Sequence, residues 1–87
     1  MKKQQLKTLV TKLSKDLFLN IKLIEDTDSI SNPNFYWLTY KVLNEDLTIT
    51  ITANCGVLRV IGQAVGTLTL LKIAELDAQL NKVIKVK

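Results

Sequence analysis

The spacing of apolar residues changes twice along this chain, and this change limits the folds that it can adopt. Over residues 3–17 the apolar side chains recur every three or four positions, as on one side of a helix, at Leu6, Leu9, Val10, Leu13 and Leu17. Over residues 19–23 apolar and polar side chains alternate, as in a strand with one buried side. Helical spacing returns at about residues 68–83. The sequence therefore predicts a helix at each end of a β-sheet.

The middle of the chain predicts three further strands. Residues 35–43 are rich in aromatic and branched side chains, residues 47–53 alternate apolar side chains with threonine, and residues 57–61 form a fourth short apolar run. Residues 26–34, which are dense in Asp, Ser, Asn and Pro, predict a loop. The chain is thus predicted to be α+β, in the order α-β-β-β-β-α. Because each helix has one apolar stripe, we expect both to pack on one face of a four-stranded antiparallel sheet.

The alternation of side chains also predicts how the strands pair. Turns of even length at residues 45–46 and 55–56 keep apolar side chains opposite one another, whereas an odd turn would set Lys41 opposite Ile49. The predicted partners are Val42 with Ile49, Tyr40 with Ile51, and Leu38 with Ala53 in the first hairpin, and Ala53 with Leu58, Ile51 with Val60, and Thr52 with Arg59 in the second.

The composition excludes most kinds of chemistry. With 87 residues, 47% of them hydrophobic, the chain is predicted to form a single domain, 1–87, with one core. It has no histidine and one cysteine, Cys55, which excludes an internal disulfide, a Cys/His zinc site and Ser-His or Cys-His catalysis. Asp26 and Asp28 resemble the start of a calcium loop, but Ser31 and Trp37 stand where that loop needs Gly and Glu. We expect no enzymatic activity, metal, cofactor or small-molecule substrate.

Charge is distributed unevenly. Residues 1–15 carry five lysines and no acid, whereas residues 16–81 carry four bases and all eight acids. The basic N-terminal helix could lie on an anionic membrane, contact nucleic-acid phosphates, or simply expose its lysines to water. A stripe of Leu and Val without Trp or Phe favours core packing and solvated lysines. Because no segment has the continuous apolar run of a membrane span or signal peptide, we expect a cytoplasmic protein that does not bind membranes.

The sheet face away from the helices is the predicted site of function. It is expected to carry Asn20, Lys22, Phe35, Trp37, Thr39, Lys41, Thr48, Thr50, Thr52, Arg59 and Ile61. Our first hypothesis is a small non-enzymatic binding or regulatory module that contacts a protein partner, or a second copy of itself, through this face or the sheet edge. The predicted contact residues are Phe35, Trp37, Lys41, Thr50, Thr52 and Arg59. Such small, chemically plain proteins are common among the accessory proteins of bacterial mobile elements and phages.

The alternative hypothesis is a nucleic-acid-binding domain. Aromatic side chains among cations are typical of surfaces that stack bases and contact phosphates. The residues predicted for this role are Lys7, Lys12, Lys15, Lys22 and Trp37. Protein contact is preferred because the face has few cations and the middle of the chain is acidic.

Overall fold

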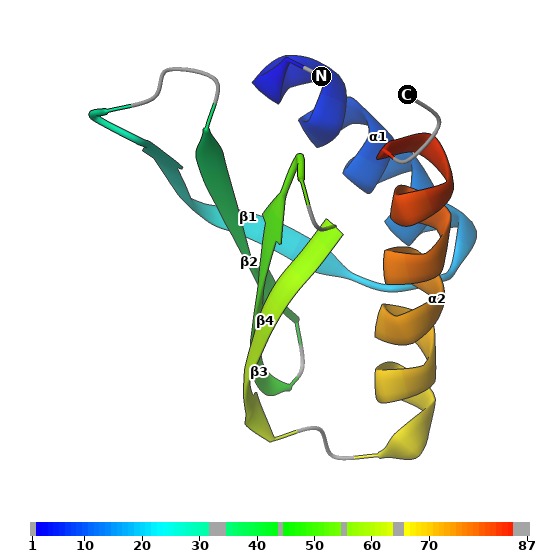
Figure 1. Cartoon of the computed structure of the whole chain (residues 1–87). Coiled ribbons are helices and arrows are strands. Elements are labelled where there is room, and N and C mark those ends of the chain that lie inside the picture. Colours follow the sequence, from blue (N-terminus) through cyan, green and yellow to red (C-terminus); the bar gives the residue numbers. More distant parts are fainter. Residues whose placement is uncertain (1, 32–34, 44, 55, 64–65, 85–87) are drawn as a thin grey trace.

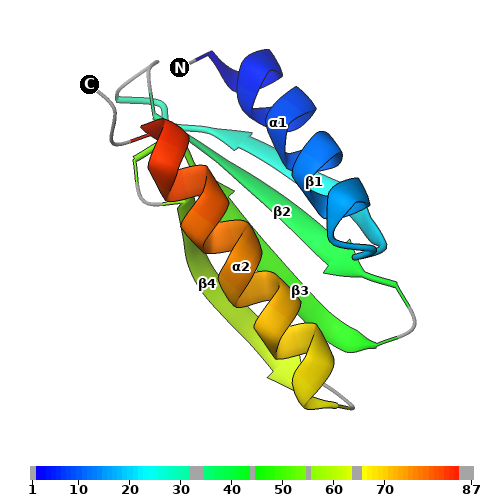
Figure 2. The ribbon, with the colours of Figure 1, turned by 90° about the vertical axis from the view of Figure 1, so that its right-hand side faces the viewer.

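The computed structural model describes residues 2–31, 35–43, 45–54, 56–63 and 66–84. Its elements are α1 (Lys3–Asp16), β1 (Ile21–Asp28), β2 (Tyr36–Val42), β3 (Asp46–Thr52), β4 (Gly56–Gln63) and α2 (Thr67–Ile84). The strands form one antiparallel sheet in the order β1-β2-β3-β4 (Figure 1). Both helices lie on the same face of this sheet, α1 beside β1 and β2 and α2 beside β3 and β4 (Figure 2). The predicted α+β fold and the order of its elements are confirmed.

One core lies between the helices and the sheet. In β2 every second side chain is buried, and the helical stripes place two side chains of α1 and three of α2 against them. The fully or almost fully buried apolar residues are Leu6, Val10, Leu19, Tyr36, Leu38, Tyr40, Val42, Leu47, Ile49, Ile51, Ile73, Leu76 and Leu80. The apolar side chains that recur every 3.6 residues in the helices therefore pack in one layer with those that recur every second residue in the strands.

The predicted register of the first hairpin is wrong by two residues. Val42 pairs with Leu47 and Tyr40 pairs with Ile49, so four residues rather than two separate the last paired positions. The predicted even turn length is right, and each side chain lies on the face expected for it. A shift by two residues leaves every side chain on its own face, so alternation in the sequence cannot distinguish the two registers.

The second hairpin shows the same shift, together with a bulge. Val60 pairs with Ile49 rather than Ile51, and Arg59 lies opposite Thr50 rather than Thr52. The register then changes, so that Leu58 is the extra residue in β4. Three residues separate the last paired positions, Thr52 and Gly56, so the even turn predicted at residues 55–56 is wrong. The bulge explains why no single register derived from side-chain alternation fits the whole hairpin.

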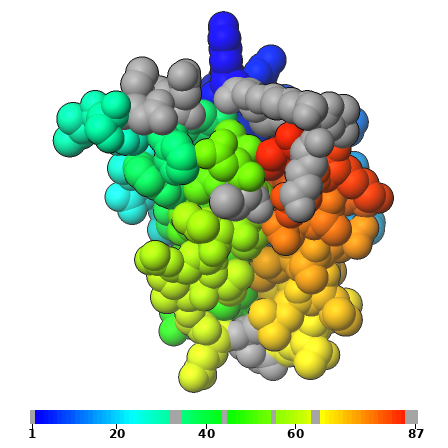
Figure 3. All heavy atoms as spheres, viewed as in Figure 1, coloured from blue at the N-terminus to red at the C-terminus, as the bar shows by residue number. Residues whose placement is uncertain are grey.

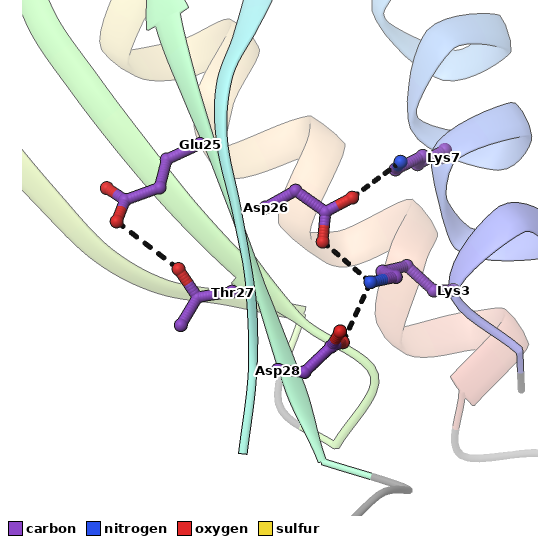
Figure 4. Close-up of polar contacts among 6 residues, drawn as sticks. All are labelled: Lys3, Lys7, Glu25, Asp26, Thr27 and Asp28. Carbon is purple, nitrogen blue, oxygen red and sulfur yellow. Dashed lines mark hydrogen bonds and ion pairs between the residues drawn. The ribbon is translucent and has the colours of Figure 1, made fainter. Parts of the chain in front are cut away.

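Strand β1 is longer than predicted and contains a bulge of its own. It continues through residues 26–28, which were predicted to be loop, and Leu23 and Glu25 pair with consecutive residues of β2, leaving Ile24 as the extra residue. The bulge reverses the alternation, so that Asp26 and Asp28 point toward α1 while Glu25 points to the other side (Figure 4).

The two aspartates of β1 bind the basic start of α1. Lys3 Nζ lies 2.7 Å from an oxygen of Asp26 and 2.7 Å from an oxygen of Asp28, and Lys7 Nζ lies 2.7 Å from the other oxygen of Asp26 (Figure 4). Hydrogen bonds from Lys3 and then Lys7 lower the pKa of Asp26 below its usual value. The prediction that these two aspartates lie in a loop is wrong, and Lys7 is not a free surface cation. The ion pairs hold α1 against β1.

Helix α1 ends in a Schellman motif with an unusual residue at its left-handed position. Leu19 N–H donates to Ser14 O at 2.8 Å and Phe18 N–H donates to Lys15 O at 3.1 Å. Phe18 has φ 55°, a conformation that normally selects Gly, and its side chain is 83% exposed. The Phe18 carbonyl accepts a hydrogen bond from Lys72 of α2 at 3.1 Å. This carbonyl links the end of α1 to the first half of α2.

Helix α2 is anchored to the start of β4. Asp77 Oδ1 accepts hydrogen bonds from Val57 N–H at 2.9 Å and from Asn81 Nδ2 at 3.0 Å. Gly56, at φ 73°, allows this approach, because a Cβ there would lie 2.7 Å from the same Asp77 oxygen. The helix begins at Thr67, one residue before the predicted start.

Candidate functional site: the uncovered sheet face

The sheet face opposite the helices, called the open face below, is lined by side chains from all four strands. The register places its residues in three rows across the sheet: Lys22, Lys41, Thr48 and Ile61; then Glu25, Thr39, Thr50 and Arg59; then Thr27, Trp37 and Thr52. Neither helix covers this face (Figure 2). The predicted contact residues Trp37, Lys41, Thr50 and Arg59 therefore share one surface.

An aromatic pair lies at one end of the open face. The rings of Phe35 and Trp37 have centroids 5.5 Å apart and planes tilted by 54°, an arrangement in which the edge of one aromatic ring approaches the face of another. Phe35 immediately precedes β2 and Trp37 is its second residue; both are half-buried. The contact with Phe35 restrains the indole while leaving part of it accessible to a partner.

Cations lie along the rest of the open face. Lys22 and Lys41 are directly opposite one another on β1 and β2, a like-charge pair that disfavours strand pairing. The side chains of these two lysines and of the exposed Arg59 on β4 form no ion pair or hydrogen bond with another described residue. Glu25 is the one acid that the rows contain, and it accepts a hydrogen bond from Thr27 at 3.3 Å. The described rows thus carry three cations and one acid.

Threonines form the centre of the open face. Thr39 and Thr50 face one another across β2 and β3, with their hydroxyl oxygens 3.4 Å apart, and both are half-buried. Thr52, in contrast, is only 2% exposed. Its short side chain lies opposite the large Trp37 on one side and Gly56 on the other. Thr52 therefore lies on the predicted face but presents almost no surface for the contact with a partner that was predicted for it.

The structure separates the residues of the nucleic-acid hypothesis. Lys7, Lys12 and Lys15 line one shallow groove of about 440 Å³ on the outer side of α1. Lys22 and Trp37 belong to the rows of the open face, on the opposite side of the sheet from α1. Lys7 is also held by Asp26, which leaves Lys12 and Lys15 as the exposed cations of that groove. These five residues do not form one continuous surface.

Two features escaped the sequence reasoning. Phe18 lies between two open grooves of about 440 and 300 Å³, both lined also by Leu19, Asn20 and Leu43. Helices commonly end with a Gly or Asn in the αL conformation, and this sequence has neither just after the last helical residue. That absence was the one sign that another residue would have to adopt the αL conformation. The second feature is the exposure of Leu58 and Val60 on β4, which alternation had assigned to the buried face.

The remaining predictions concern metals, membranes and the thiol. Within the ranges that the structure describes, no three His, Cys, Asp or Glu side chains gather as metal ligands would. Neither α1 nor α2 is both long enough and apolar enough to cross a membrane. Cys55 lies outside the described residues, so its predicted place at a hairpin tip stays a prediction. No known protein family, curated protein or solved structure matches this chain.

Proposed function

We propose that this domain is a small non-enzymatic module whose open face binds an acidic surface of a partner protein. The observation that carries the proposal is the half-buried Phe35–Trp37 pair on the same face as cations that have no partner among the described residues. Tryptophan and arginine are the residues that most often dominate binding energy at protein interfaces. Trp37 would be the anchor at one end of the face, with Arg59 in the next row and Lys41 in the row after that.

The like-charge pair on the open face supports an acidic partner. Lys22 and Lys41 lie directly opposite each other, and such a pair weakens an isolated sheet. A carboxylate placed between them would remove this repulsion and gain two ion pairs. The half-buried threonine hydroxyls of the central strands would contribute hydrogen bonds without adding charge. The face therefore suits a protein surface that is apolar opposite Trp37 and acidic opposite the lysines.

A protein partner fits the charge of this face better than nucleic acid does. Three cations and one acid give the described rows a small positive charge, and tight phosphate binding usually requires more cations along one path. The lysines of α1 cannot supply them, because α1 lies on the other side of the sheet. Nucleic-acid binding stays the alternative, with Lys12 and Lys15 as its main candidates.

Binding to an identified partner tests the proposal. The wild-type protein would be used to capture partners from cells that naturally carry it, and affinities would then be measured with the purified partner by calorimetry. Trp37→Ala should weaken binding by about 30-fold, as expected for an interface hot spot worth about 2 kcal/mol. Lys41→Glu should weaken binding more at low than at high salt. Because Trp37 is the only tryptophan, its emission should shift to shorter wavelength when the partner covers it.

The matched control is Lys12→Glu, which changes the charge by the same amount as Lys41→Glu but lies on α1. It should bind the partner with wild-type affinity. Equal affinities for the wild type and Trp37→Ala would contradict the proposal. Binding of short single- or double-stranded oligonucleotides at low salt, weakened by Lys12→Glu and not by Trp37→Ala, would favour the nucleic-acid alternative instead.

The proposal includes the setting expected from the sequence. A binding module with one cysteine and no need for a disulfide suits the cytoplasm, where a thiol stays reduced. An accessory role in a phage or another mobile element would be consistent with a small domain that acts by binding a host protein. Both statements belong to the proposal and depend on the identity of the partner.

A further inference from the structure

The two edges of the sheet differ in how they are protected from pairing with another strand. The outer strand β1 carries a bulge at Ile24 and charged side chains at Lys22, Glu25, Asp26 and Asp28. Charges and bulges are the devices by which proteins keep an edge strand from pairing with another chain. The other outer strand, β4, carries Arg59 as its one charged residue and has its bulge near its start. β4 is therefore the less protected edge.

Apolar side chains are exposed along β4 and beside it. Leu58 is 48% exposed, Val60 42% and Ile61 53%, all within one strand. Leu70 of α2 is also 48% exposed. It lies two helical turns before Asp77, whose carboxylate accepts a hydrogen bond from the start of β4. Residues two turns apart share one side of a helix, so Leu70 lies on the β4 side of α2. Figure 3 shows β4 and the first half of α2 side by side on one side of the molecule.

We propose that β4 pairs antiparallel with β4 of a second copy of this chain. A twofold axis perpendicular to the sheet would join two four-stranded sheets into one of eight strands and bring the two α2 helices together on the same face. With Val60 on the axis, Leu58 faces Gly62 and Arg59 faces Ile61 of the second copy. The two arginines are then not opposite one another, so nothing in this register repels.

The exposed apolar side chains supply about half of the area that a standard interface buries on each partner. Exposed branched side chains at these fractions present on the order of 100 Å² each, so the four residues supply roughly 400 Å² of apolar surface per copy. A standard interface buries about 800 Å² per partner, including its polar rim. The backbone of β4 and side chains such as Gln63 would supply the remainder. Val60 lies on the helix side of the strand, opposite Ile49, and Ile61 on the open side, opposite Thr48, so both sides of this edge carry exposed apolar side chains.

This dimer forms along the edge strand β4, whose Arg59 and Ile61 also border the open face, and it leaves Trp37, Lys22 and Lys41 outside the contact. In the joined sheet both open faces would point to the same side, away from all four helices. A partner with two sites, or two partners, could then be bound at once, which would increase the apparent affinity without new contacts. The dimer itself does not depend on the open face having a partner.

Sedimentation equilibrium of the wild type and of edge variants tests the inference. The wild type should be a dimer at micromolar concentration. Val60→Lys, which places a lysine opposite its own copy on the axis, should raise the dimer dissociation constant by about 100-fold or more. The matched control is Ile24→Lys, which adds the same charge to an exposed branched residue of the other edge strand and should leave the dimer intact.

Further measurements keep the test decisive. If Val60→Lys does not fold, Leu70→Lys on the surface of α2 should weaken the same dimer. Amide hydrogen exchange of the wild type should slow in β4 as concentration rises, and not in β1. A wild type that stays monomeric at high concentration, or a dimer that survives both Val60→Lys and Leu70→Lys, would overturn the inference. Trp37→Ala should remain dimeric, which separates this result from any failure of partner binding.

Discussion

The left-handed residue at the end of α1 predicts an unusual result: replacing this exposed phenylalanine with glycine should stabilise the protein. Phe18 occupies the αL position of a Schellman motif, with φ 55° and a side chain 83% exposed. A non-Gly residue in this region costs about 1–2 kcal/mol relative to Gly. Phe18→Gly removes that cost but gives the unfolded chain more freedom, which offsets about 0.5–1 kcal/mol. Little burial is lost, because the ring is mostly in water.

Phe18→Gly should therefore raise the free energy of unfolding by about 0.5–1 kcal/mol. For a domain of this size, that corresponds to an increase in Tm of about 2–8 °C. Urea and thermal unfolding followed by far-ultraviolet circular dichroism, at one fixed protein concentration, would measure it. The fixed concentration matters because dimerisation would also change the apparent stability.

Phe18→Ala is the control that separates the backbone from the ring. It removes the aromatic side chain but keeps a Cβ in the left-handed conformation, so its stability should stay close to that of the wild type. Phe18→Asn should lie between Ala and Gly, because Asn tolerates this conformation better than other residues with a Cβ. If Phe18→Gly is no more stable than Phe18→Ala, the backbone of Phe18 is not strained and the reasoning fails.

Two further predictions concern the contacts that hold the helices. Gly56→Ala should destabilise the protein by about 2 kcal/mol, because the added methyl group would meet the Asp77 carboxylate and the residue has a positive φ. Gly66→Ala is the control and should be close to neutral, because a Cβ at that position meets no atom within 4 Å. Chemical denaturation of the two variants would show the difference. Asp26 has a pKa below its ordinary value of 3.8. Its contribution to the free energy of unfolding is therefore complete above pH 3.8 and is lost as the pH falls through the lowered pKa. Asp26→Asn should therefore be less stable than the wild type at neutral pH and equally stable in acid; a difference that persists at a pH well below 3.8 would argue against the ion pairs as its source.

The sequence predicted which residues belong to the candidate site, but not how exposed each of their side chains is. Alternation along β2 and β3 was enough to place Trp37, Thr50 and Thr52 on the same face, because side chains alternate strictly in a regular strand. It could not show that Thr52 is buried, because that depends on which residue lies opposite. The cross-strand neighbour is Trp37, and this follows from a register that alternation leaves undetermined.

Bulges limited the sequence reasoning in both outer strands. At Ile24 the extra residue reverses the alternation, turning Asp26 and Asp28 toward Lys3 instead of into water. At Leu58 an extra residue again interrupts the alternation of side chains, and Leu58 and Val60, which were expected in the core, are exposed. A bulge arises from how two strands fit together over a twisted sheet, so the sequence of one strand carries little sign of it.

The sequence by itself determined the class and order of the elements, because the apolar period changes from 3.6 to 2 and back, and each period permits one kind of element. It also determined which face of the two central strands, β2 and β3, meets the helices. Only the tertiary structure decided the register, the ion pairs between α1 and β1, and the difference between the two sheet edges. These depend on contacts between residues distant in the chain, whose geometry a local pattern of polar and apolar residues does not specify.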